Sequence, residues 1–191
     1  MSYLAVAVTG VAALSLVNTW LIIAMARKMR GQGEELARRV SRPRRDVGLP
    51  AGTRVPEFTV TTMTGATVSA EDLRGQRSVV AFFSPGCEPC HEQAPVFAAF
   101  ARARPDGAGG TRTLAVICGG HRAAGGADND AARLAGQLAD VTDVVGEPSA
   151  GMVAAALGAT GFPSFIVVDA DGRVEAGAHT VAAIAGIAAS A

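Results

Sequence analysis

The amino-acid sequence predicts an α/β protein with a parallel strand–helix–strand unit at its centre. The apolar run over residues 79–83 is typical of a strand buried on both faces. The segment that follows repeats apolar residues at helical spacing from Cys90 to Ala101. A second apolar run covers residues 113–118. A helix that joins two buried neighbouring strands favours a right-handed βαβ unit.

The beginning of the chain predicts a membrane anchor. No charged side chain occurs over residues 3–26, and a helix of this length spans the roughly 30 Å hydrocarbon core of a bilayer. Tyr3 and Trp20 lie near its ends, as interfacial aromatic residues do. A cleavable signal peptide is disfavoured because no basic segment precedes the apolar run, which is also too long. We expect residues 1–26 to be a transmembrane anchor, with a buried core helix as the alternative.

Basic residues gather directly after this segment, although the formal net charge of the chain is zero. Residues 27–45 hold eight of the 17 basic and two of the 17 acidic residues, which leaves nine basic and 15 acidic residues elsewhere. A basic patch confined to a juxtamembrane stretch favours lipid headgroups over nucleic acid, so no nucleic-acid partner is expected. We interpret residues 27–48 as a basic juxtamembrane helix and linker, and residues 49–191 as one domain.

The remaining elements of the domain follow from turn signals and periodicity. Met63-Thr64-Gly65 between two short extended runs predicts a hairpin, and Ser69 to Asp72 resembles a helix start. Asp171-Gly172 predicts a second hairpin near the end of the chain. Helices are expected over residues 130–139, 149–157 and 180–188, and strands over residues 141–145, 164–168 and 173–178.

The chemistry is expected at Cys87-Glu88-Pro89-Cys90. Cys87 falls at the helix N-terminus, where free N–H groups stabilise a thiolate, and Cys90 lies one turn further along. Pro89 is tolerated in the first turn because its missing N–H would have no helical partner. Three cysteines cannot form a disulfide framework, so the pair is expected to do chemistry. Cys87 is the candidate attacking thiol and Cys90 the candidate resolving thiol of disulfide exchange.

Glu88 and Pro89 are expected to tune the redox properties of the pair. The negative charge of Glu88 lies beside the nascent thiolate of Cys87 and opposes the helix dipole. A thiolate that is less stabilised favours the disulfide form at equilibrium, so the reduced protein is expected to act as a reductant.

The chain resembles the thioredoxin-like superfamily over roughly residues 49–190, and most of all the membrane-anchored TlpA/ResA-like disulfide reductases. The likeness rests on Cys87-Glu-Pro-Cys90, on Pro95 five residues later, and on Gly161-Phe162-Pro163. It implies a central mixed sheet flanked by helices, with an N-terminal hairpin extension and a helix–strand insertion. It also implies exchange with protein disulfide or dithiol substrates, an electron donor that the sequence does not identify, and no cofactor.

The same resemblance assigns substrate-binding residues. Pro163 would form a cis peptide bond facing the cysteines, and the backbone of Phe162 would pair with an extended substrate segment. Gly86 stands where such sites usually carry an aromatic residue. Gln93 replaces a glutamate of the ResA-like group that assists proton transfer, and His91 is expected to be a solvent-exposed helix residue.

Three alternatives stay open at this point. A peroxiredoxin-type peroxidase is disfavoured because Ser84-Pro-Gly-Cys87 fits its Thr/Ser-x-x-Cys arrangement only in part. A zinc-stabilised assembly module could use Cys118-Gly-Gly-His121 together with the cysteine pair, although Cys118 is also expected to be a small core residue. A cysteine pair without turnover would make the domain a binding module.

Two observations disagree about the side of the membrane on which the domain lies. The basic residues after the apolar segment favour the cytoplasmic side by the positive-inside rule. Relatives in the TlpA-like group usually face outward. The expected location is therefore the cell membrane, with a single span and an undecided side.

Overall fold

The computed structural model describes residues 47–104, 106–107, 110–119 and 127–189, together with residue 15 and residues 18–20. The chain divides into two compact units, Met1–Arg45 and Asp46–Ala191. Within the described residues, no helix is long and apolar enough to cross a membrane. Most of the expected anchor and nearly all of the basic segment lie outside these residues, and both stay predictions.

The second unit is built on a five-stranded mixed sheet in the order β5-β4-β3-β6-β7. Strands β5, β4 and β3 are parallel, whereas β6 and β7 run antiparallel to β3 and to each other. A separate hairpin pairs β1 with β2. The strands are β1 (Thr59–Thr61), β2 (Thr67–Ser69), β3 (Ser78–Phe83), β4 (Arg112–Cys118), β5 (Asp143–Glu147), β6 (Ser164–Val168) and β7 (Val174–Ala178).

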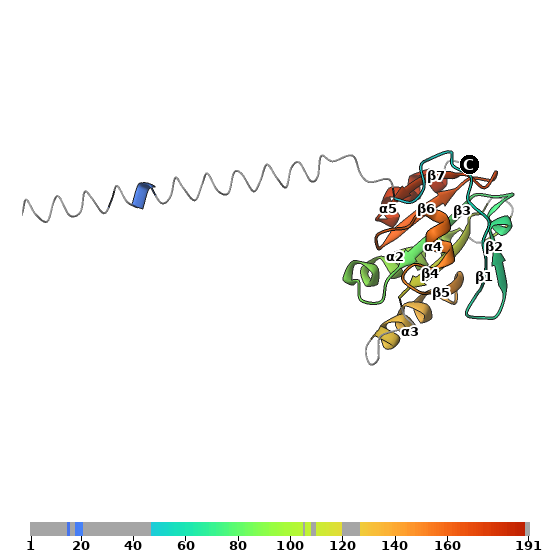
Figure 1. Cartoon of the computed structure of the whole chain (residues 1–191), viewed down its shortest axis with the longest axis horizontal. Helices are drawn as coiled ribbons and strands as arrows, with labels where there is room; N and C mark the ends of the chain where they lie inside the picture. Colours follow the sequence, from blue (N-terminus) through green and yellow to red (C-terminus); the bar gives the residue numbers. More distant parts are fainter. Residues whose placement is uncertain are drawn as a thin grey trace, which may run out of the picture. The chain divides into compact units, whose positions relative to one another are not determined.

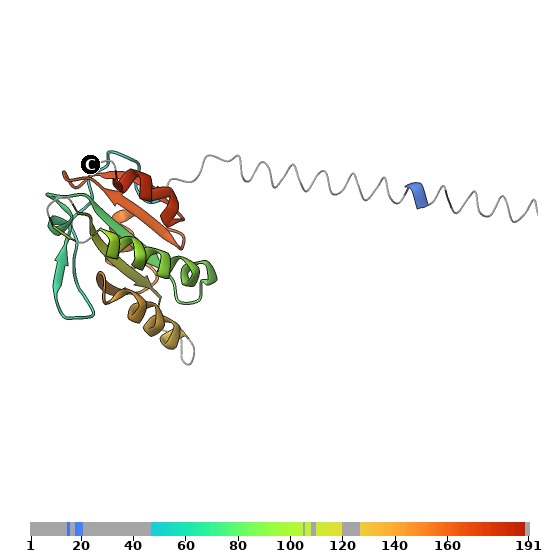
Figure 2. The same cartoon turned by 180° about the vertical axis from the view of Figure 1, so that it is seen from behind.

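Helices cover both faces of this sheet (Figures 1 and 2). Helices α2 (Glu88–Ala103), α3 (Ala127–Leu138) and α5 (Val181–Ala189) pack on one face. Helix α4 (Met152–Leu157), the 3-10 helix η1 (Ala70–Leu73) and the β1–β2 hairpin pack on the other. Every residue of β3 is buried, which explains why its sequence is continuously apolar instead of alternating. The predicted α/β class and the mixed sheet flanked by helices are confirmed.

Strand β3, helix α2 and strand β4 form the predicted βαβ unit. The two strands are parallel, and Phe83 at the end of β3 pairs with Ile117 near the end of β4. The turn into α2 therefore leaves the sheet at the carboxyl edge of its parallel strands, the edge at which α/β proteins bind ligands.

The observed bounds differ from the predicted ones in the second half of the chain. Strand β5 begins at Asp143 instead of residue 141, because the Val141 N–H bonds back to the carbonyl of Leu138 and extends the preceding turn. Helix α4 begins at Met152 instead of residue 149. The buried carboxylate of Glu147 accepts hydrogen bonds from the N–H groups of Val153 and Ala154, in the first turn of α4, at 2.8 and 3.3 Å, and this contact sets where the helix begins.

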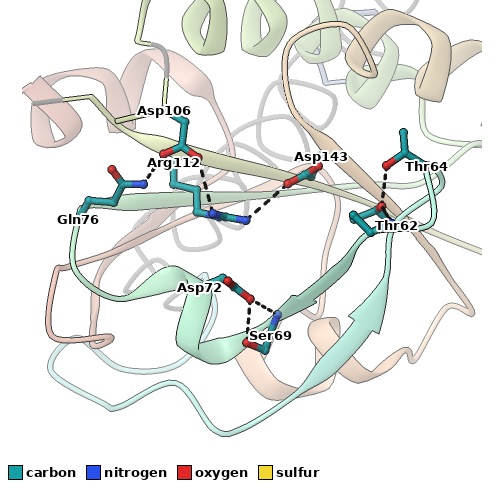
Figure 3. Close-up of polar contacts among 9 residues, drawn as sticks. Thr62, Thr64, Ser69, Asp72, Gln76, Asp106, Arg112 and Asp143 are labelled. Carbon is teal, nitrogen blue, oxygen red and sulfur yellow. Dashed lines mark hydrogen bonds and ion pairs between the residues drawn. The ribbon is translucent and has the colours of Figure 1, made fainter. Parts of the chain in front are cut away.

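A polar network lies at the amino-terminal ends of β4 and β5 (Figure 3). Arg112 lies between Asp106 and Asp143, with N–O distances of 3.6 and 3.5 Å. In the same view Asp72 accepts hydrogen bonds from the hydroxyl and the backbone N–H of Ser69 at 2.8 and 2.7 Å. These two bonds lower the pKa of Asp72, because they favour the charged carboxylate. The helix start predicted at Ser69 is confirmed as the start of η1.

The backbone of Val47 lies very close to Gly177, and this contact predicts the effect of a substitution on stability. A Cβ added at Gly177 in β7 would collide with the carbonyl group of Val47. We expect Gly177→Ala to lower the free energy of unfolding by about 1–3 kcal/mol, as overpacking does. Gly136→Ala on the exposed side of α3 is the control, because a Cβ there meets no atom within 4 Å and alanine favours a helix. Chemical denaturation of both variants provides the comparison, and equal midpoints for Gly177→Ala and the parent would contradict the prediction.

Candidate active site

The two cysteines lie where β3 gives way to α2. Cys87 is the N-cap residue of the helix, in an extended conformation with φ −105° and ψ 106°. Its N–H donates to the Ser84 carbonyl at 3.2 Å, and its own carbonyl accepts from the Cys90 N–H at 2.9 Å. Pro89 lies in the first turn. The Cys87 sulfur is thus at the positive end of the helix dipole, as the sequence predicts.

The environments of the two thiols differ. Cys87 is half-buried, whereas Cys90 is fully buried against the apolar face of α2. The Cys90 sulfur accepts a hydrogen bond from the Ser84 N–H at 3.4 Å. Burial, together with the hydrogen bond to Cys87, raises the pKa of Cys90 to about 12. Both thiols are free, and only Cys87 is open to a partner.

Aromatic packing holds this strand–helix junction in place. Phe83 is the last residue of β3, and its ring lies edge-on to Phe97 of α2 and Phe165 of β6, with centroids 6.0 and 5.8 Å apart. Such pairs add to the stability gained from burial alone. These contacts fix the middle of α2 to the sheet through Phe97.

A loop with a cis peptide bond faces Cys87. The Phe162–Pro163 bond is cis, as the resemblance implies, and Pro163 is buried. The Cys87 thiol donates to the Phe162 carbonyl at 3.6 Å, across 75 positions of the sequence. The structure thus brings Cys87, Cys90, Phe162 and Pro163 together. Gly86 is exposed beside Cys87, and a Cβ there would meet no atom within 4 Å.

An open cavity of about 450 Å³ adjoins the same turn. It is lined by Pro85, Gly86, Glu88 and His91 from the turn and α2, and by Asp130 and Arg133 from α3. Glu88 is exposed in the first turn of α2. The residues on both sides of Cys87 therefore form part of the cavity wall.

The sequence of the second unit matches a known protein family over most of its length. The Redoxin family model matches residues 50–181, which is well over half of the chain. The chain belongs to the Redoxin family. A curated relative, the thioredoxin-like protein YneN of Bacillus subtilis (strain 168), is 29% identical over 52 residues. That match covers 27% of this chain and only 31% of the relative.

Solved structures establish the fold of this Redoxin-family protein. The thioredoxin domain of a Bacteroides vulgatus thiol-disulfide oxidoreductase has a TM-score of 0.59 at 22% identity, covering 73% of this chain and 95% of that one. A secreted Mycobacterium tuberculosis disulfide oxidoreductase, homologous to E. coli DsbE, has a TM-score of 0.55 at 21% identity, covering 70% and 96%. The fold is therefore thioredoxin-like. Family and fold together make this chain a thioredoxin-like oxidoreductase.

Two side chains of the Redoxin-family site have roles that sequence reasoning missed. The side-chain oxygen of Gln93 accepts a hydrogen bond at 3.0 Å from the N–H of Val181, the first residue of α5. The ring of His179 donates to the Pro163 carbonyl at 2.6 Å, because a carbonyl oxygen can only accept. Gln93 therefore ties α2 to α5, and His179 holds the loop that carries Pro163. No local sequence pattern signals either contact.

The expectation for His91 was wrong. Its side chain is half-buried, and both ring nitrogens have partners. Nε2 lies 2.7 Å from the Pro85 carbonyl, and Nδ1 lies 3.2 Å from the guanidinium of Arg133 on α3. Helix α3 packs beside the site, and its Arg133 contacts His91, so the outer face of α2 is only partly open to solvent at this position.

Cys118 lies apart from the other two cysteines. It is buried in the core on the opposite face of the sheet from Cys90. Burial, reinforced by the charge of Glu147, raises the pKa of Cys118 to about 12. The prediction of a small core residue is confirmed. His121, which the zinc alternative needs, lies outside the described residues, and within them no group of three or more potential ligands could hold a metal ion.

Proposed function

We propose that this Redoxin-family protein is a membrane-anchored thiol–disulfide oxidoreductase that reduces disulfides in protein substrates. The observation that carries the proposal is the asymmetry of the two thiols. Cys87 is accessible at the start of α2, and Cys90 is buried one turn below it. Disulfide exchange needs one thiol that attacks and a second that resolves the mixed disulfide.

The reaction proceeds in two exchanges. The Cys87 thiolate attacks one sulfur of the substrate disulfide, whose S–S bond breaks, and the leaving sulfur takes up a proton. The thiolate of Cys90 then attacks the sulfur of Cys87 and releases the second substrate thiol, which also takes up a proton. The substrate gains two electrons and two protons, and the protein is left with a Cys87–Cys90 disulfide. An electron donor, still unidentified, must then reduce this disulfide.

The high pKa of Cys90 keeps this thiol protonated in the free dithiol and leaves the first attack to Cys87. In the free dithiol, the hydrogen bond and the charge of Cys87 both contribute to raising the pKa of Cys90. Both contributions disappear once the Cys87 sulfur is bonded to a substrate. Burial, the largest cause of the raised pKa of Cys90, remains, so the first exchange removes only the part that Cys87 contributes.

An extended polypeptide is the substrate class that the loop geometry supports. The carbonyl of Phe162 points to the Cys87 sulfur, 3.6 Å away. A substrate segment that places its sulfur next to Cys87 passes the backbone of Phe162, where it can pair as an added strand does. Gly86 offers no side chain on the other side of Cys87, so this position does not restrict the approach.

The reducing direction rests on Glu88, whose carboxylate is the first charge on α2. Equilibration of the Cys87–Cys90 couple with glutathione buffers tests this direction. We expect a potential closer to that of thioredoxin, about −270 mV, than to that of DsbA, about −120 mV. A potential near the DsbA value would reverse the proposed direction.

The membrane anchor rests on the uncharged residues 3–26, and the side of the membrane needs an experiment. The basic residues 27–45 favour a cytoplasmic domain. The secreted Mycobacterium tuberculosis relative favours the outer side. A thiol reagent that cannot cross membranes, added to intact cells, labels Cys87 only if the domain lies outside. Extraction with carbonate tests the anchor itself, since a chain released into the soluble fraction would lack one.

The decisive test is turnover of a protein disulfide. With dithiothreitol as the electron donor, the full chain in detergent is expected to accelerate the reduction of insulin. A peroxidase would instead consume hydrogen peroxide at the expense of the same donor. A chain that does neither would be a binding module, and metal analysis of the purified protein would then test the zinc alternative.

A further inference from the structure

The ring of His91 has a hydrogen-bonding pattern that assigns its protonation. A carbonyl oxygen accepts and cannot donate, so the contact of Nε2 with the Pro85 carbonyl at 2.7 Å requires a proton on Nε2. A guanidinium donates and cannot accept, so the contact of Arg133 with Nδ1 at 3.2 Å requires a lone pair on Nδ1. The two partners together select the neutral Nε2–H ring.

These contacts continue into α3. Arg133 also pairs with Asp130 at 3.4 Å, one turn earlier on the same helix. A chain of polar contacts therefore runs from Asp130 through Arg133 and His91 to the carbonyl of Pro85. It joins α3 to the turn that carries Cys87, across 42 positions between Arg133 and His91.

Within the turn, a backbone hydrogen bond from the Cys87 N–H to the Ser84 carbonyl at 3.2 Å joins its two ends. Pro85 has no N–H to donate, and Gly86 is exposed with no side chain to pack. The peptide between these two residues leads directly to Cys87. The side chain of His91, at the start of helix α2, contacts the oxygen of that peptide.

We propose that His91 is a positioning residue for disulfide exchange. By holding the Pro85 carbonyl and bonding to Arg133, it fixes the turn before Cys87 in the conformation from which the sulfur attacks. The inference rests on the exchange activity proposed above and assigns a residue that the Cys-x-x-Cys motif does not contain. Positioning of a reacting group within a fraction of an ångström has large effects on rate.

Two substitutions of His91 separate its two contacts. The longer side chain of His91→Gln can place an amide N–H close to the position of Nε2, and the shorter one of His91→Asn can place an amide oxygen close to that of Nδ1. We expect His91→Gln to keep most of the single-turnover rate of insulin reduction. We expect His91→Asn to lower that rate about fivefold, the change that loss of one hydrogen bond produces. The insulin concentration at half-maximal rate is expected to stay the same in both variants.

Several outcomes would overturn the positioning role. Equal rates for His91→Asn and the parent would overturn it. A loss of rate in both variants that is matched by the same loss of thermal stability would also overturn it, because the effect would then be structural. A change in half-saturation with an unchanged maximal rate would make His91 a substrate-binding residue instead. If the parent chain has no exchange activity at all, the proposed function fails, and the kinetic comparison of the variants fails with it.

The protonation assignment has a test that is independent of activity. Long-range ¹H–¹⁵N correlation spectra of the histidine rings distinguish a protonated ring nitrogen from an unprotonated one. The chain has three histidines, and His91→Asn identifies the signal of His91. In the full chain at neutral pH we expect the Nε2–H pattern. An Nδ1–H pattern or a doubly protonated ring would contradict the contacts that carry the inference.

Discussion

Cys87→Ser abolishes insulin reduction, and Cys90→Ser stops the reaction one step later, as a covalent complex with the substrate. A serine at position 87 cannot attack a disulfide sulfur at neutral pH, so no exchange begins. In Cys90→Ser the attack by Cys87 still occurs, but no second thiol in the site resolves the product. We expect loss of turnover to background in both variants, and non-reducing gels to show the mixed disulfide only with Cys90→Ser.

The matched control for this pair is Cys118→Ser. Cys118 is as buried as Cys90 but lies on the opposite face of the sheet, so its replacement should leave turnover intact even if it costs stability. Turnover retained by Cys87→Ser would remove the basis of the proposed function. A mixed disulfide formed by Cys87→Ser would mean that another thiol attacks.

Iodoacetamide added to the reduced, folded chain modifies Cys87 alone at pH 8. Alkylation requires a thiolate, and burial raises the pKa of both Cys90 and Cys118 to about 12. At pH 8 a thiol with that pKa is a thiolate in only about one molecule in ten thousand. Its thiolate population grows about tenfold with each pH unit up to the pKa, so slow modification of Cys90 is expected first at strongly alkaline pH.

Mass spectrometry of the alkylated chain measures this selectivity. Unfolding in guanidinium chloride before the reagent is added is the control, and it should expose all three thiols to modification. Modification of Cys90 at pH 8 at a rate close to that of Cys87 would show that Cys90 is neither buried nor neutral. The distinction between an attacking and a resolving thiol would then be lost.

Local patterns in the sequence were sufficient to predict the central unit. The continuous apolar run of β3 reflects burial on both faces, and the helical spacing from Cys90 to Ala101 reflects one buried face of α2. Each pattern repeats within a few residues and reports the period of its own element. The position of Cys87 at the N-cap follows from the same reasoning, because it depends only on where the strand ends and the helix begins.

Predictions that depended on distant partners were less accurate. The start of α4 was placed three residues too early, because Glu147, from the preceding strand, caps it. His91 is predicted to be solvent-exposed, whereas its contact with Arg133 of α3 leaves it half-buried. The cis bond before Pro163 was expected only from the resemblance to a family, since proline by itself rarely adopts this form.

The sequence alone determined that this chain carries a reactive cysteine pair at the start of a helix on an α/β sheet. The tertiary structure alone decided what surrounds that pair: the Phe162 carbonyl beside Cys87, Gln93 against α5, and His91 between Pro85 and Arg133. The partners in these contacts come from segments as far as 88 residues apart. Contacts between such segments depend on how the helices pack on the sheet, and the periodicity of a single element contains no information about that packing.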